Sequence, residues 1–101
     1  MSASPQDEVF IHIRSDEQEM LAIRIKEKLQ RDGYSVPRII PVTFGPKENE
    51  VRYFHRDRLE ASIVLHDLRD LGLGHIALKS IAHYESNPPS RYELWLGPHT
   101  R

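Results

Sequence analysis

The apolar residues of this chain follow two different spacings, which alternate along its length. Val9, Ile11 and Ile13 recur at every second residue, which is typical of a half-buried strand. Apolar stripes at helical spacing follow over 16–32 and, more regularly, over 57–71. We therefore expect helices over these two ranges and strands over 9–14, 38–44, 50–55, 75–82 and 91–96.

This order predicts an α+β fold of the split βαβ, ferredoxin-like type with an extra C-terminal strand. Right-handed crossovers would place both helices on one face of the sheet. In that plan strands 9–14 and 50–55 are neighbours at the centre. Strand 38–44 lies at an edge, where Pro41 is tolerated because it has no N–H to donate. The other face is open or covered by a partner.

Length and composition favour a single domain over 9–96, with a loose lead-in over 1–8 and a tail over 97–101. The chain has no cysteine, which excludes disulfides, thiol catalysis and thiolate metal sites. Its 14 Lys and Arg nearly balance 15 Asp and Glu, so no overall field favours nucleic acid. We expect no membrane span and, if the chain is complete, a cytoplasmic protein.

Two segments carry a resemblance to known families. The segment EVRYFHRDRLEASIVLHDLRDLGLG over 50–74 resembles the second half of the LytR C-terminal domain family. The segment LAIRIKEKLQRDGYSVPRI over 21–39 resembles the other element of that family, an apolar-faced helix before a glycine-aromatic turn. The SPOR family of peptidoglycan-binding domains has the same plan. The resemblance covers Val9–Ala82, and the extension after Ala82 departs from both families.

The resemblance implies a bacterial accessory module that is not an enzyme. SPOR domains bind glycan on the open sheet face. The residues here that match that face by alternation are Phe10, His12, Arg14, Arg52 and Phe54.

Alternation alone selects the same candidate surface. If Val9 faces the helices, the side chains of Phe10, His12 and Arg14 lie on the opposite face. Burying an arginine is expensive, so Arg52 and Phe54 belong there too. We predict stacking by the two aromatic rings and charge-assisted hydrogen bonds from Arg14 and Arg52 to an anionic or hydroxyl-rich ligand.

Other uses of this surface remain open. The extra strand or the proline-rich loop over 85–90 would cover Phe10 and Phe54 if either packs over them. A protein partner, or a second copy of the chain, would use the same face. Nucleic acid is the weaker choice, because EVRYFH has no glycine and one arginine, unlike the motif of an RNA-recognition strand.

Tyr92 and Trp95 fall on opposite faces of the last strand, so one belongs to the core and the other is exposed. The exposed ring would offer a second interface, since a terminal edge strand recruits partners. The interpretation that we favour is that Trp95 seals the open sheet face.

The six histidines show no metal-ligand spacing on a helix, although His12 and His55 would approach each other if their strands are neighbours. Gly72 and Gly74 end a helix rather than begin one, which is the wrong polarity for a phosphate loop. No strained turn marks a nucleophile.

The sequence therefore favours a small binding or regulatory module that is not an enzyme and has no metal or cofactor. Its partner would be a protein or a second copy of itself, with glycan as a further candidate.

Overall fold

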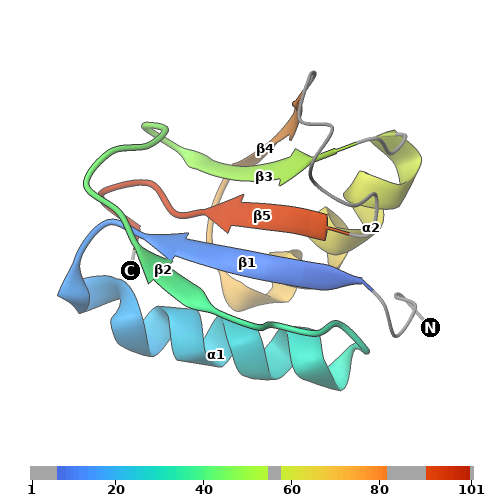
Figure 1. Cartoon of the computed structure of the whole chain (residues 1–101), viewed down its shortest axis with the longest axis horizontal. Helices are drawn as coiled ribbons and strands as arrows, with labels where there is room; N and C mark the ends of the chain where they lie inside the picture. Colours follow the sequence, from blue (N-terminus) through green and yellow to red (C-terminus); the bar gives the residue numbers. More distant parts are fainter. Residues whose placement is uncertain (1–6, 55–57, 82–90, 101) are drawn as a thin grey trace.

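The computed structural model describes residues 7–54, 58–81 and 91–100 of the chain (Figure 1). It confirms the α+β class: one mixed sheet of five strands carries two helices. Residues 1–6 of the lead-in predicted over 1–8, His55 and the loop over 85–90 lie outside the described residues. Of the rest of the lead-in, Asp7 is buried and Glu8 begins the first strand. The elements are β1 (Glu8–Ile13), η1 (Asp16–Gln18), α1 (Glu19–Arg31), β2 (Ile39–Pro41), β3 (Asn49–Tyr53), α2 (Arg58–Leu68), η2 (Arg69–Leu71), β4 (Ile76–Ser80) and β5 (Arg91–Trp95).

The sheet contains two similar units, each made of a strand, a helix and a parallel neighbouring strand. In the first unit β1 pairs with β2, and in the second unit β3 pairs with β4. The last strand, β5, lies between the units, parallel to β1 and antiparallel to β3. The strand order is therefore β2-β1-β5-β3-β4 (Figure 1).

This order corrects one expectation from the sequence. β1 and β3 were expected to be direct neighbours, with the fifth strand as an addition. Instead β5 separates them and pairs with both. Tyr92 and Leu94 of β5 are almost fully buried, so the inserted strand supplies the middle of the core. The expected edge position of the strand containing Pro41 is confirmed, because β2 is the outermost strand on its side.

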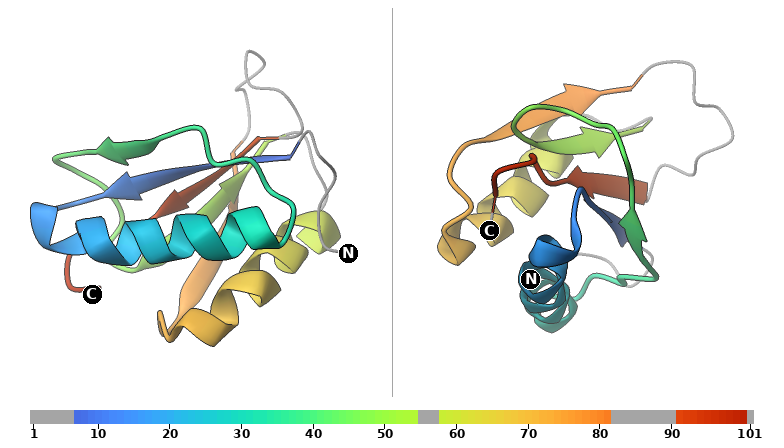
Figure 2. Two further views of the ribbon diagram at one scale, coloured as in Figure 1. Left: turned by 90° about the horizontal axis from the view of Figure 1, so that it is seen from below. Right: turned by 90° about the vertical axis from the view of Figure 1, so that its left-hand side faces the viewer.

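The core lies between the sheet and the two helices, which sit on the same side of it (Figure 2). The expected alternation of β1 is present: Val9, Ile11 and Ile13 are buried toward the helices. Each helix adds a buried stripe at helical spacing. The stripe consists of Leu21, Ala22, Ile25 and Leu29 in α1, and of Ala61, Val64 and Leu68 in α2.

Residues 97–100, expected to be a tail, are held against the domain by two buried amide side chains. The Nε2 of Gln18 donates to the carbonyl oxygens of Gly97 and Thr100 at 2.6 and 2.8 Å. The Oδ1 of Asn49 accepts from the Gly97 N–H at 2.9 Å and from the Thr100 hydroxyl at 2.7 Å. Gln18 follows β1 and Asn49 begins β3, so each unit supplies one side-chain amide that binds this segment.

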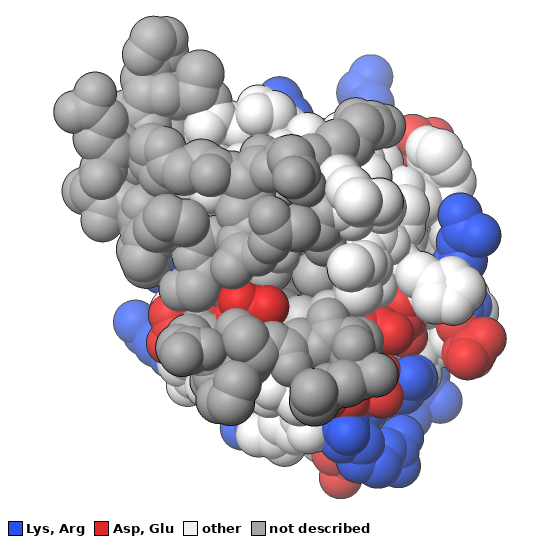
Figure 3. Space-filling model, turned by 90° about the vertical axis from the view of Figure 1, so that its right-hand side faces the viewer, with Lys and Arg blue, Asp and Glu red and all other residues white. Residues whose placement is uncertain are grey.

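Charges of both signs are interspersed on the side of the molecule seen in Figure 3, where Lys and Arg lie beside Asp and Glu over the described part. This matches the near balance of the whole sequence. In the part of the chain that the structure describes, no helix is both long and apolar enough to cross a bilayer.

Candidate functional site

The candidate site lies on the sheet face opposite the helices and is built by alternate residues of the three central strands. Strand pairing sets its rows, because paired residues project to the same face. One row places His12 beside Trp95, and Trp95 beside Glu50. The next row places Phe10 beside Glu93, and Glu93 beside Arg52. We call this surface the open face.

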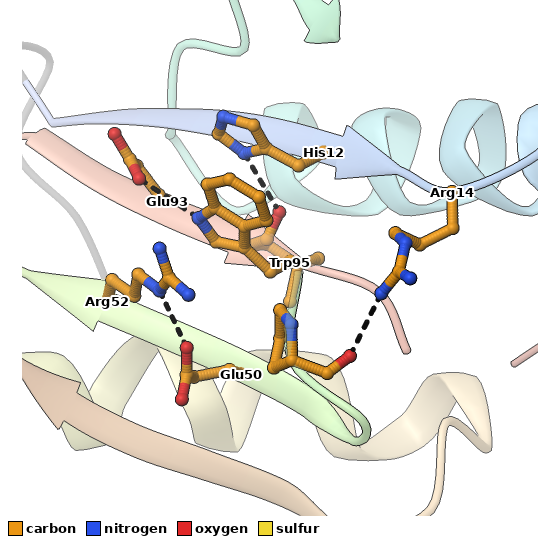
Figure 4. A network of polar contacts seen from close by, with 8 residues as sticks. His12, Arg14, Glu50, Arg52, Glu93 and Trp95 are labelled. Carbon is orange, nitrogen blue, oxygen red and sulfur yellow. Dashed lines mark hydrogen bonds and ion pairs between the residues drawn. The ribbon is translucent and has the colours of Figure 1, made fainter. Parts of the chain in front are cut away.

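Trp95 is the centre of the open face. Its ring stacks on the imidazole of His12, with centroids 4.0 Å apart and planes 2° from parallel. The guanidinium of Arg52 lies 4.2 Å from the indole centroid and reaches it from β3, on the other side of β5. The indole Nε1 donates a hydrogen bond to Glu93 Oε1 at 3.0 Å (Figure 4). Trp95 is only 7% exposed and therefore acts as a platform that fixes its charged neighbours.

Arg52 is oriented by two contacts that leave part of its guanidinium available. Its Nε donates to Glu50 Oε2 at 2.6 Å, and its plane rests near Trp95 (Figure 4). Among the described residues its two terminal nitrogens have no hydrogen-bond partner. A guanidinium held in this way presents donors in a fixed geometry, which lowers the entropy lost when they bind an acceptor.

His12 is neutral in this environment. Burial lowers the pKa of its imidazole below the ordinary 6.5, and nearby Arg52 acts in the same direction, although the Glu93 carboxylate opposes the shift. Its Nδ1 donates to the Leu94 carbonyl oxygen at 3.4 Å, which fixes the ring against the indole. The stack therefore consists of two neutral rings with the Arg52 cation at its β3 side.

A hollow of about 270 Å³ opens beside Trp95 on the open face. This is slightly smaller than the roughly 300 Å³ at the lower end of small-molecule sites, so it fits a small group or one part of a larger ligand. Phe44 stands at its rim: it is 70% exposed, and its ring is tilted by 45° to that of Trp95 at 6.1 Å. The hollow is lined by Phe44, Arg52, Phe54, Ile81, Glu93 and Trp95.

The residues predicted from sequence reach this region to different degrees. Arg52 and Phe54 line the hollow, whereas Phe10 and Arg14 do not. Phe10 instead lies 3.8 Å below the guanidinium of Arg91. Arg14 donates from Nη1 to the Pro46 carbonyl oxygen at 3.1 Å and so holds the loop that carries Phe44 (Figure 4).

Two expectations about exposed aromatic rings are corrected. Phe54 is only 2% exposed, so its ring is not the exposed stacking surface that was expected. Tyr92 belongs to the core, and Trp95, on the opposite face, is covered by its stacking partners. Neither lies at a sheet edge, because β5 pairs on both sides and offers no free backbone to a second chain. The expected edge position of the last strand is therefore wrong, and a partner contact at Tyr92 or Trp95 stays a prediction.

Sequence reasoning missed Phe44 and Glu93. Alternation within 91–96 places Glu93 on the face of Trp95, and that signal would have identified it once β5 was known to be central. Phe44 ends the strand predicted over 38–44, but that strand stops at Pro41 in the structure, so its alternation did not place Phe44 at the hollow. Among the described residues, no three potential metal-ligating side chains cluster together.

Comparisons of the chain with protein-family models, with curated proteins and with solved structures found no match.

Proposed function

We propose that this domain is a binding module, without a catalytic step, that holds a hydroxyl-rich, glycan-type ligand on its open face. The observation that carries the proposal is the hollow beside Trp95, in which an exposed aromatic ring faces one fixed cation and one fixed carboxylate. A sugar ring has the matching chemistry, because its C–H face is apolar and its rim carries donors and acceptors.

Each group has a definite task in this proposal. The exposed ring of Phe44 packs against the apolar face of the sugar. The terminal nitrogens of Arg52 donate to hydroxyl or carboxylate oxygens. The carboxylate of Glu93, already oriented by Trp95, accepts from a hydroxyl. Because the platform is assembled before binding, little side-chain entropy is lost on ligand capture.

The resemblance of Val9–Ala82 to peptidoglycan-binding modules selects the first glycans to test. We expect the wild-type protein to be retained on purified peptidoglycan, and retention to change little as salt rises. Nucleic-acid binding would instead weaken steeply with salt, since it releases counterions from phosphates. The proposal would be contradicted if the protein is not retained on peptidoglycan but binds nucleic acid with an affinity that falls steeply as salt rises.

Phe44→Ser is the sharpest variant, because the ring is exposed and its removal leaves the core intact. We expect it to lose about tenfold in glycan affinity, which corresponds to about 1.4 kcal/mol. The matched control is Met20→Ser, since Met20 is 71% exposed on α1, away from the open face. Equal binding by the two variants would place the ligand elsewhere.

Self-association through the open face is the second candidate, and the exposure of Phe44 is the observation that favours it. Light scattering of the wild type and of Phe44→Glu separates the two functions. A dimer that Phe44→Glu converts into a folded monomer would make the face an assembly surface. Phe54→Glu is unsuitable for this test, because the nearly complete burial of Phe54 would make the variant unfold.

A further inference from the structure

The free edge of β4 is a second surface with features of a binding site. β4 pairs with β3 on one side, and on the other side no described strand pairs with it. The Ile81 N–H donates to the Tyr53 carbonyl oxygen at 3.0 Å, which shows that this residue directs its backbone toward β3. Since backbone groups alternate along a strand, Ile76, Leu78 and Ser80 direct their N–H and C=O groups outward.

A groove runs beside this edge. A hollow of about 450 Å³ is lined by Leu65 and Arg69 of the helical segment and by residues 74–78. A second hollow of about 370 Å³ shares Leu65 and Arg69 and continues along α2 past Ile63. Consecutive residues of β4, whose side chains point to opposite faces of the sheet, line the first hollow. The hollow therefore lies along the strand edge rather than over one face.

The chemistry of the groove is apolar with a cationic border. Leu65, Ile76 and Leu78 provide the apolar wall, and none of the described residues that line either hollow is acidic. Arg69 is exposed at the helix side of the edge, and Lys79 is exposed on the open face. Neither has an ion-pair partner among the described residues.

We propose that the β4 edge takes an extended peptide segment of a partner protein, with alternating apolar and acidic residues, as a sixth strand. The outward backbone groups of β4 supply the ladder. Apolar side chains on one face of the peptide enter the groove, which Arg69 borders, and the carboxylates, which all lie on the other face, meet Lys79. The other edge is unsuited to this role, because β2 has three residues and ends at Pro41.

The test uses the full chain and a fluorescein-labelled peptide of sequence Gly-Val-Glu-Val-Glu-Val-Glu-Gly, with fluorescence anisotropy as the readout. We expect saturable binding that weakens about tenfold or more in the double variant Arg69→Glu/Lys79→Glu. The same peptide with lysine in place of glutamate should bind the double variant better than it binds the wild type. Arg24→Glu/Arg31→Glu on α1 is the matched control, since it makes the same charge change on exposed residues far from β4.

A backbone variant tests the strand pairing itself. Ser80→Pro removes one outward N–H without removing a bond to β3, so it should weaken peptide binding while circular dichroism shows a folded domain. The proposal is overturned if the acidic peptide shows no saturable binding up to about 1 mM. It is also overturned if both charge variants bind equally, or if light scattering shows a dimer that Ser80→Pro abolishes, since a second copy then occupies the edge.

Discussion

The two units of the sheet have the same order of elements but end in different edges. The first unit carries a helix of 13 residues and closes with the three-residue strand β2. The second unit carries a helix of 11 residues, a further helical turn and the five-residue strand β4. The first edge, β2, is short and ends at Pro41, which has no N–H to donate. The second edge, β4, is longer and has a groove beside it. Similar architecture therefore produces one short edge and one longer edge, and it is the longer edge that we propose for a partner.

The largest expected effect tests whether the two units fold together. Leu29 of α1 and Leu68 of α2 are both fully buried, so each can be changed to alanine as a matched pair. We expect each substitution to cost about 2–5 kcal/mol, because it removes buried methyl groups and leaves a cavity. Both variants should unfold in a single transition, measured by calorimetry and by circular dichroism, since β5 joins the units. Two separate transitions would show that the units are independent.

The two buried amides test how each unit holds the segment 97–100. Asn49→Ala would orphan the Leu73 carbonyl oxygen, which now accepts at 2.8 Å, and the Gly97 N–H. Gln18→Ala would orphan the Arg14 N–H and one or more carbonyl oxygens. We expect each variant to lose about 2–3 kcal/mol in urea unfolding, because buried polar groups lose their partners. Gln30→Ala, on the exposed side of α1, is the control and should change stability by less than about 0.5 kcal/mol.

Acid should lower the free energy of unfolding through His12 of the first unit. His12 in the first unit is buried with a lowered pKa, whereas His66 and His75 in the second unit are exposed. The folded state binds a proton at His12 less readily than the unfolded state, so the free energy of unfolding falls as pH drops below about 6.5. His12→Gln should flatten this dependence between about pH 8 and about pH 5. An unchanged slope in His12→Gln would remove His12 as its source.

The smallest effect on stability concerns the edges themselves. Lys79→Val on β4 and Thr43→Val beyond β2 are both exposed changes, so each should alter stability by no more than about 0.5 kcal/mol. We expect the β4 variant alone to associate as concentration rises, because a charge on an edge strand opposes unwanted pairing. Analytical ultracentrifugation would detect this difference, and equal behaviour of the variants would mean that the edges are equivalent.

Periodicity predicted the elements well because it reports a local property. The alternation of Val9, Ile11 and Ile13 and the stripes of the two helices depend on which side of each element is buried. The same alternation placed Tyr92 and Trp95 on opposite faces correctly. Alternation carries no information about neighbours, however, so the insertion of β5 between β1 and β3 could not be read from it.

The candidate site was predictable in part for the same reason. The faces of His12, Arg52 and Phe54 followed from their positions in strands. Their burial did not, because it depends on β5: its Trp95 covers His12 and supports Arg52. Phe44 reaches the hollow from a loop whose path is fixed by long-range contacts such as the bond from Arg14 to Pro46.

The position of β5 also bears on how the chain folds during synthesis. The ribosome makes β5 after the four other strands, yet β5 lies between the two pairs of strands that are made before it. Until it emerges, β1 and β3 each expose a bare edge, and the pairing of β1 with β5, such as that of Glu8 with Arg91, joins residues from near the two ends of the sequence. Such late, non-local closure slows folding and leaves a nascent chain vulnerable to pairing with its neighbours. The strand that completes the open face is also the last strand to be made, and we expect the unfinished sheet to be prone to wrong pairing until it is in place.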